Sequence, residues 1–196
     1  MKLNTPNILT LARIFITPFF LWIILWESLP HRFLIACIVF SLGAITDALD
    51  GHLARKNNQV TNFGKFLDPI ADKVLTTSAL LAFMSMGLCN IWIVMIVLTR
   101  EFAIASVRMI AASGGVVIPA NVWGKIKTIS QMVFTILIML LGEAYDIVEN
   151  TDIDLFVKLP DLSIVSNGLL WITAILTVVS GVIYLVDSRK IIDFTK

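Results

Sequence analysis

Charged residues are scarce in this chain of 196 residues, at 15%, and histidine and cysteine are rarer still, with two of each. Neither Cys37 nor Cys89 has a second cysteine or a histidine at the spacing of a zinc site, so we expect no zinc site and no disulfide framework. The formal net charge is +1 and no basic tract is present, which argues against nucleic-acid binding. Without an evident internal repeat or low-complexity segment, the sequence predicts a single domain over residues 1–196.

Hydrophobic residues are abundant instead, at 58%, and the mean hydropathy is +0.89. These values are typical of membrane proteins, in which about 20 helical residues cross the hydrocarbon core. Lipid-facing backbone must satisfy its own hydrogen bonds, which favours helices. We therefore predict an all-α integral membrane protein with six transmembrane helices, at about 8–26, 33–55, 69–88, 91–112, 122–141 and 164–186. The first span is expected to be retained, because Arg13 interrupts it and no cleavage site follows.

The basic residues are unevenly distributed between the two ends of these spans. With six spans, one side receives both termini and two loops, and it carries Lys2, Lys56, Lys65, Arg189, Lys190 and Lys196. The other side has only Arg32 and Lys158, and its last loop, 142–163, is acidic. Because Lys and Arg favour the cytoplasmic side, we expect both termini on the cytoplasmic side of a bacterial-type cytoplasmic membrane.

The most polar stretch of the chain runs from residue 47 to residue 72. It contains four aspartates, Asp47, Asp50, Asp68 and Asp72. The first two are three residues apart and the last two are four apart, so each pair shares one face of a helix. Two such helices, joined by a polar turn at 56–64, suit a hard divalent cation held between carboxylates and substrate phosphates. Arg55 can hold a phosphate and Gly51 lets a ligand approach closely, so these residues predict a cytoplasmic site for metal-assisted phosphoryl transfer.

An alternative is that these charges line a pore or cap helices. Asp68 before Pro69 has the form of a helix N-cap followed by proline at the first helical position. That interpretation is the simpler one for any single aspartate. The four aspartates together with Gly51 and Arg55 favour the metal site.

The same stretch resembles the signature of the CDP-alcohol phosphotransferases, D-x₂-D-G-x₂-A-R-x₈-G-x₃-D-x₃-D, at every fixed position. Those positions are Asp47, Asp50, Gly51, Ala54, Arg55, Gly64, Asp68 and Asp72. The resemblance implies that the four aspartates hold two divalent ions, Mg²⁺ or Mn²⁺, and that Asp72 is the general base. It also implies that Gly51, Arg55 and Thr61 bind the CDP part of the donor.

The first span carries polar residues on one helical face, Asn7, Thr10 and Arg13. Taken alone, Asn7 could cap the helix and Arg13 could extend along it to the membrane surface. Members of the same family often carry a similar N-x₂-T-x₂-R near the start, and the resemblance implies that these residues line the nucleotide pocket.

Two further stretches carry charge, REF-x₅-R from Arg100 to Arg108 and GKIKT from Gly124 to Thr128. Alone, Arg100 and Glu101 suggest ion pairs between helices, and Lys125 and Lys127 suggest interfacial anchors. Together the stretches resemble the phosphatidylglycerophosphate synthase branch of the family. Glycerol 3-phosphate is a dianion, so we expect Arg108, Lys125 and Lys127 to bind the acceptor phosphate, with Arg100, Glu101, Ala54 and Gly64 as supporting residues.

The resemblance implies transfer of the phosphatidyl group from CDP-diacylglycerol to glycerol 3-phosphate, giving phosphatidylglycerophosphate and CMP, by a homodimer in membrane lipid. One alternative is a sister enzyme that uses inositol phosphate, serine or phosphatidylglycerol as acceptor. Another is an ion-coupled transporter, which would place polar residues across the depth of the membrane, often in repeated halves.

Overall fold

The computed structural model describes residues 5–57, 62–113, 122–150 and 160–189, with side chains over 11–46, at 71, and over 73–112, 122–149 and 160–189. These residues form six helices and no strand, which confirms the predicted all-α class. The helices are α1 (Thr5–Leu25), α2 (Arg32–Asn57), α3 (Asn62–Ser85), α4 (Ile91–Ser113), α5 (Val122–Asn150) and α6 (Leu162–Arg189).

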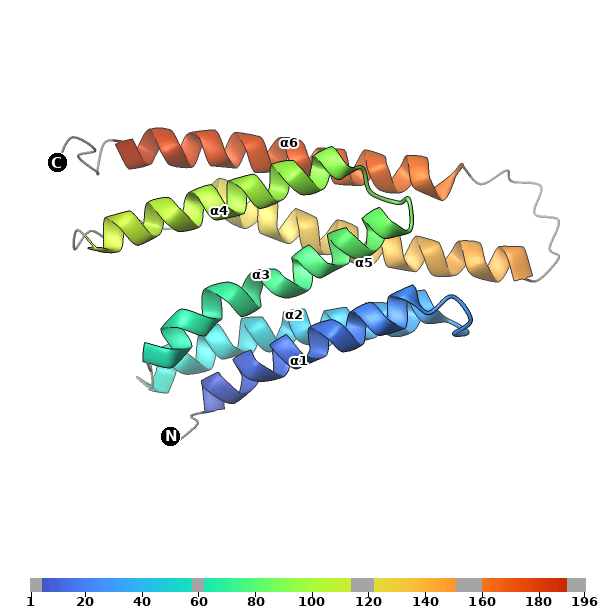
Figure 1. Cartoon of the computed structure of the whole chain (residues 1–196), viewed down its shortest axis with the longest axis horizontal. Coiled ribbons are helices and arrows are strands. Elements are labelled where there is room, and N and C mark those ends of the chain that lie inside the picture. Colours follow the sequence, from blue (N-terminus) through green and yellow to red (C-terminus); the bar gives the residue numbers. More distant parts are fainter. Residues whose placement is uncertain (1–4, 58–61, 114–121, 151–159, 190–196) are drawn as a thin grey trace.

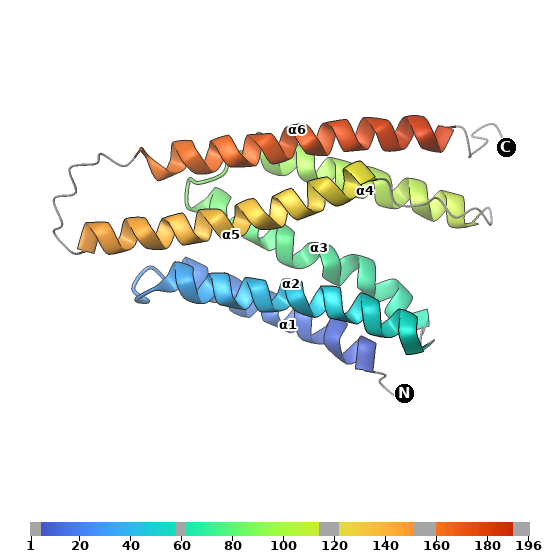
Figure 2. The ribbon, with the colours of Figure 1, turned by 180° about the vertical axis from the view of Figure 1, so that it is seen from behind.

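All six helices run roughly along the long axis of an elongated bundle (Figures 1 and 2). Helix α1 packs against α2 and α3, α5 packs against α2 and α6, and α4 packs against α6. The start of α1 and the end of α6 lie at one end of the bundle, together with the end of α2 and the start of α3 (Figure 1). We call this the motif end and the opposite end the far end.

Two predicted helix boundaries are wrong. Helix α3 begins at Asn62, so Asp68 lies inside a helix and the N-cap interpretation of Asp68 fails. Most of the expected turn at 56–64 is likewise helical, because α2 ends at Asn57 and only residues 58–61 separate the two helices. Helix α5 continues to Asn150, so the first part of the expected acidic loop is helical.

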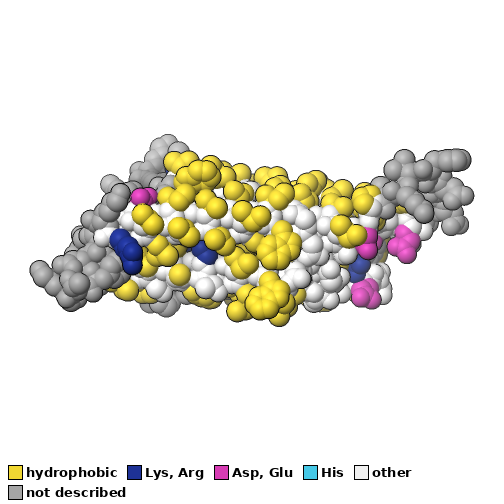
Figure 3. Space-filling model, turned by 90° about the horizontal axis from the view of Figure 1, so that it is seen from above, with side chains coloured by type: hydrophobic (Ala, Val, Ile, Leu, Met, Phe, Trp, Pro, Cys, Tyr) yellow, Lys and Arg dark blue, Asp and Glu magenta, His cyan; other side chains and the backbone are white. Residues whose placement is uncertain are grey.

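The exterior of the bundle is strongly apolar. Val122–Glu149 and Leu162–Arg189 are long and apolar enough to cross a membrane, with mean hydropathies of 1.6 and 2.4. Only 33% and 39% of their most apolar windows are buried, so most of these side chains face outward. Figure 3 shows hydrophobic side chains over the middle of the bundle and acidic side chains mostly at the far end. This surface suits contact with lipid.

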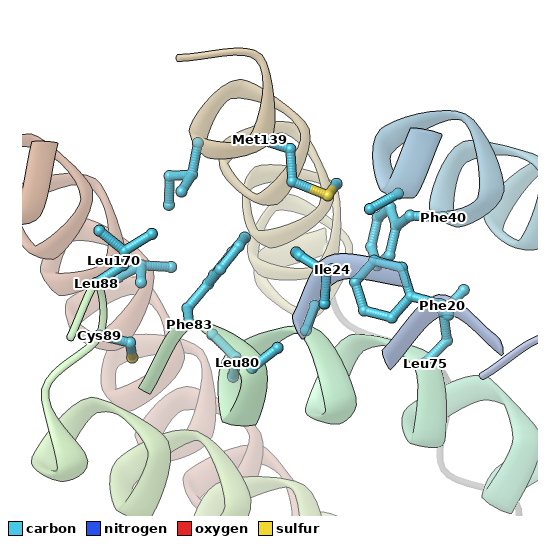
Figure 4. Packing of buried hydrophobic residues seen from close by; sticks show 14 of the residues in the cluster. Phe20, Ile24, Phe40, Leu75, Leu80, Phe83, Leu88, Cys89, Met139 and Leu170 are labelled. Atoms are coloured by element: carbon cyan, nitrogen blue, oxygen red, sulfur yellow. The ribbon is translucent and has the colours of Figure 1, made fainter. Parts of the chain in front are cut away.

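The buried core joins all six helices in the half of the bundle nearer the far end (Figure 4). Phe20 of α1 and Phe40 of α2 pack with ring centroids 5.8 Å apart. Leu80 and Phe83 of α3 are fully buried, and Met139 of α5 and Leu170 of α6 complete the cluster. The core therefore fixes the helices at a distance from the aspartate motif.

A buried carboxylate also ties α5 to the start of α2 at the far end. Glu143 Oε1 lies 2.5 Å from His31 Nδ1, and Glu143 Oε2 accepts the backbone N–H of Leu34 at 3.1 Å. Arg32 and Asp146 add an ion pair at 3.7 Å. Glu143 thus supplies a hydrogen-bond acceptor to the first turn of α2, where backbone N–H groups have no partner within the helix.

Candidate functional site: an aspartate motif beside a buried ion cluster

The aspartate motif lies on two neighbouring helix ends. Helix α2 runs unbroken through Asp47 and Asp50, and α3 runs through Asp68 and Asp72. The helical backbone places each pair on one face of its helix. Since four residues separate the helices, their ends are at most about 19 Å apart, at 3.8 Å per Cα step. The expected helices are therefore present, whereas the four aspartate side chains lie outside the described ones and their role as ligands stays a prediction.

Four carboxylates on two neighbouring helix ends form an all-oxygen set of donors. Hard divalent cations such as Mg²⁺ and Mn²⁺ prefer this chemistry, so the motif fits the predicted ions. Among the described residues, no group of three His, Cys, Asp or Glu side chains could hold a metal ion.

Most residues expected at the CDP part of the donor lie on α1 and α2. Asn7 and Thr10 are in α1 and Gly51 and Arg55 are in α2, with side-chain positions outside the described part. Thr61 falls in the undescribed segment between α2 and α3. The supporting residues Ala54 of α2 and Gly64 of α3 also lie where the structure gives the helix but not the side-chain contacts.

Among the residues expected to bind the CDP part of the donor, Arg13 is the one whose side chain the structure describes, and it lies inside the bundle. It is 3% exposed, so it does not extend to the surface as the alternative interpretation required. It lines a small cavity with residues of α2, α3 and α5, namely Phe40, Gly43, Ala44, Leu75, Thr76 and Met132. An arginine inside a membrane bundle usually faces an anion or a carboxylate.

Glu101 of α4 is the centre of a buried ion cluster. Its Oε1 atom accepts hydrogen bonds from Lys127 Nζ at 2.7 Å and from Arg100 Nη1 at 2.9 Å. Its Oε2 atom accepts a hydrogen bond from Lys73 Nζ. One carboxylate from α4 therefore binds cations from α3, α4 and α5. With three cations and one carboxylate, the cluster has an excess of two positive charges.

Small residues make room for this cluster. A Cβ atom at Gly124 of α5 would lie 3.5 Å from Arg100 Nη2, and one at Gly181 of α6 would lie 3.1 Å from Arg100 Cγ. Arg100 Nη2 donates to Ser180 Oγ at 3.1 Å. The arginine side chain is thus enclosed between α5 and α6, which extends the cluster to a fourth helix.

The three residues expected to bind the acceptor phosphate differ in their exposure and in their partners. Lys127 is 3% exposed and paired with Glu101. Arg108 is exposed, and its Nε donates to Tyr184 Oη of α6 at 3.2 Å. Lys125 is exposed on α5. Arg100 and Glu101, expected as supporting residues, lie with Lys127 in one cluster.

Sequence reasoning missed two residues of this region, Lys73 and Tyr184. Lys73 directly follows Asp72, the last fixed position of the signature, and a lysine near the end of a span was no signal by itself. Tyr184 is 3% exposed in an apolar span. Its partner Arg108 is 76 residues away in the chain, so nothing in the sequence around Tyr184 pointed to it.

Comparison with known proteins gives a consistent result. The family pattern described as CDP-alcohol phosphatidyltransferase matches residues 3–180. A CDP-diacylglycerol–glycerol-3-phosphate 3-phosphatidyltransferase of Bacillus subtilis is 39% identical over 91% of this chain and 91% of its own length. Proteins of the same name from Rickettsia bellii and Wigglesworthia glossinidia brevipalpis are 33% and 38% identical, over 95% and 76% of this chain and 96% and 82% of their own lengths.

Proposed function

This chain belongs to the CDP-alcohol phosphatidyltransferase family, and from this premise we propose that it transfers the phosphatidyl group of CDP-diacylglycerol to glycerol 3-phosphate. The products are phosphatidylglycerophosphate and CMP, which makes the chain an enzyme of phospholipid synthesis. The observation that carries this proposal is the similarity to the Bacillus subtilis enzyme of that name over 91% of both chains. The three cations around Glu101 and the exposed Arg108 support an anionic acceptor.

In the proposed reaction, a hydroxyl oxygen of glycerol 3-phosphate forms a bond to the phosphorus that carries diacylglycerol. The bond from that phosphorus to the CMP oxygen breaks, and CMP leaves with the electron pair. Asp72 takes the proton of the attacking hydroxyl. Because a phosphoryl transfer asks little covalent chemistry of the protein, positioning and charge stabilisation carry most of the rate.

The other residues bind and orient the two substrates. Asp47, Asp50, Asp68 and Asp72 would hold two divalent cations, Mg²⁺ or Mn²⁺, which when bound neutralise charge on the reacting phosphates. Arg13 and Arg55 would contact the CDP part, with Asn7, Thr10, Gly51 and Thr61 beside them. Arg108, Lys125 and Lys127 would bind the acceptor phosphate, Arg108 through its Nη groups, since its Nε donates to Tyr184 Oη.

We also propose that all six helices span the membrane, with the motif end on the cytoplasmic side. The shortest helix, α1, has 21 residues, or about 31 Å at 1.5 Å per residue, which matches a hydrocarbon core. The motif would then face soluble glycerol 3-phosphate. A homodimer in the membrane, which the family resemblance implies, is part of this proposal.

The test is CMP release from CDP-diacylglycerol in detergent with Mg²⁺, with and without glycerol 3-phosphate. We expect release to require glycerol 3-phosphate and to fall about 10³-fold in Asp72→Asn. The matched control is Asp146→Asn at the far end, which should retain activity. Release only with inositol phosphate, serine or phosphatidylglycerol would replace the acceptor. No release with any alcohol would contradict the enzyme assignment and favour the alternative of an ion-coupled transporter.

A further inference from the structure

Glu101 binds across the place where two neighbouring helices separate. Helices α3 and α4 meet at the far end, at the short connection 86–90, and diverge toward the motif end (Figure 1). Glu101 of α4 spans this divergence to Lys73 of α3, and with its other oxygen binds Lys127 of α5. Lys73 directly follows Asp72 in the chain. One carboxylate thus connects α3, which carries the proposed base Asp72, to α5, which carries Lys127, a residue proposed to bind the acceptor phosphate.

The cluster is enclosed enough for these contacts to be strong. The side chains of Glu101 and Arg100 are 15% and 14% exposed, and that of Lys127 is 4% exposed, while Lys73 is more open at 34%. Shielding from water strengthens the interaction between charges. If the carboxylate of Glu101 were removed, three cations would face one another without a counter-charge, and at least one would have to move.

We infer that Glu101 is a positioning residue for the acceptor, fixing the ammonium groups of Lys73 and Lys127 so that the phosphate dianion of glycerol 3-phosphate is held where its hydroxyl can react. This inference rests on the proposed function. The excess of two positive charges matches a dianion. Glu101 itself needs no contact with the substrate, since it acts through the two lysines.

The inference predicts that Glu101→Gln slows the reaction without weakening the binding of glycerol 3-phosphate. In Glu101→Gln the excess charge rises from two to three, so the dianion binds as tightly as before or more tightly. Its position is no longer fixed, and misplacement of a reacting group by a fraction of an ångström is enough to slow the reaction. We expect kcat to fall about tenfold or more, with the KM for glycerol 3-phosphate unchanged or lower and the KM for CDP-diacylglycerol unchanged. Glu101→Asp, which keeps the charge, should recover part of the kcat.

The matched control is Glu143→Gln, because Glu143 is also a buried carboxylate that joins two helices, but at the far end. A purely structural role would give Glu101→Gln and Glu143→Gln the same pattern, namely lower thermal stability and a smaller folded fraction, with kcat per folded enzyme and both KM values unchanged. That result would overturn the inference. So would a raised KM for glycerol 3-phosphate with unchanged kcat, since Glu101 would then contribute to binding alone.

A second measurement separates this inference from the proposed function. The thermal unfolding of detergent-solubilised protein is followed with glycerol 3-phosphate or inorganic phosphate and without CDP-diacylglycerol, so that no turnover is needed. We expect either anion to stabilise the wild type and Glu101→Gln, and to stabilise Lys127→Met much less. If the wild type is stabilised but turns nothing over, the proposed function fails and the anion site stands. Absence of stabilisation by both anions in the wild type would overturn the inference even if the enzyme is active.

Discussion

At the scale of single residues, Arg108 offers a direct test of how the acceptor phosphate is held. Its Nε donates to Tyr184 Oη at 3.2 Å, and its guanidinium carbon lies 5.5 Å from the centre of the Tyr184 ring. Arg108→Lys keeps the charge but loses the bond from Nε and the planar fork that binds two phosphate oxygens. We expect the KM for glycerol 3-phosphate to rise roughly tenfold, or about 1.4 kcal/mol, with little change in the KM for CDP-diacylglycerol.

A control for this substitution is Arg32→Lys at the far end. Arg32 also lies over an aromatic ring, that of Phe33 at 4.9 Å, and pairs with Asp146. Steady-state kinetics of Arg32→Lys should match the wild type. If Arg108→Lys instead raises the KM for CDP-diacylglycerol, Arg108 belongs with the donor, and its assignment to the acceptor is wrong.

The four aspartates make a second prediction at this scale, on removal of metal. Chelation with EDTA should abolish CMP release, and added Mg²⁺ or Mn²⁺ should restore it, because four carboxylates on adjacent helix ends repel one another without cations. Mg²⁺ should also raise the unfolding temperature of the wild type, since a ligand that binds only the folded state stabilises it. Asp50→Asn should show a smaller increase. Full turnover in excess EDTA would contradict the metal assignment.

The residues of the aspartate motif were predictable from the sequence, because they stand at fixed spacings along the chain. The partners in the ion cluster were not predictable, because they come together only when the helices pack. The eight fixed positions of the signature can be found by counting. The pairing of Lys73 with Glu101 joins residues 28 apart on different helices, and nothing in the spacing of either residue indicates the other. Arg100 and Glu101 suggested ion pairs between helices, and only the packing of α3, α4 and α5 identified the partners.

At the scale of helices, two glycines in similar helical settings should respond differently to the same substitution. A Cβ atom at Gly142 of α5 would lie 2.8–3.0 Å from three ring atoms of Phe33, and Phe33 is 2% exposed, so the ring has little room to move. Gly142→Ala should cost about 1–3 kcal/mol and lower the unfolding temperature by roughly 2–10 °C. Differential scanning fluorimetry in detergent would measure this change.

Gly168 of α6 is the matched position, since a Cβ atom there meets nothing within 4 Å. Gly168→Ala should leave the unfolding temperature unchanged or raise it slightly, because alanine favours a helix over glycine. Both sites lie away from the motif end, so kcat per folded enzyme should not change in either variant. Equal unfolding temperatures for the two variants would show that the contact between α2 and α5 is not as close as the structure has it.

Helix positions were predictable from apolar runs, but helix ends were predictable only where the apolar run and the helix end together. The predicted start of the fourth span at 91 and the start of the fifth at 122 agree with α4 and α5. Hydropathy marks where a helix is apolar, whereas backbone hydrogen bonding continues through polar residues. Residues 62–68 of α3 and 142–150 of α5 therefore read as loops although they are helical. Glu143 supports that extension, because its bonds to His31 and Leu34 require α5 to reach the far end.

At the scale of the whole molecule, composition was enough to predict an all-α bundle with an apolar exterior. Outward-facing residues such as Phe15, Trp92 and Ile164 are 74%, 66% and 69% exposed, which a water-soluble protein would avoid in such number. The predicted orientation of the bundle rested on a different signal, the uneven distribution of Lys and Arg between the two ends. That distribution determines which end stays in the cytoplasm, and it does not affect how the helices pack. Orientation is therefore the global property that most needs a measurement.

Labelling of introduced cysteines can measure the orientation. The background from the wild type is low, because both native cysteines are buried. Cys89 lies in the short connection between α3 and α4, where burial raises the pKa of its thiol to about 12. Only the thiolate reacts with maleimides, and a pKa far above neutral leaves almost none of it at pH 7. Cys37 is 7% exposed in α2. The wild type should therefore remain nearly unlabelled by a membrane-impermeant maleimide.

Single cysteines at the two ends then report the orientation. Glu27 is exposed between α1 and α2 at the far end, and Arg189 is exposed in the last turn of α6 at the motif end. In intact cells, Glu27→Cys should be labelled at once and Arg189→Cys only after the membrane is permeabilised. The reverse pattern would place the aspartate motif outside the cytoplasm, away from the soluble pool of glycerol 3-phosphate. Labelling of both positions in intact cells would mean that the six helices do not cross the membrane as one antiparallel bundle, because an even number of crossings puts the connection after the first helix and the end of the sixth on opposite sides.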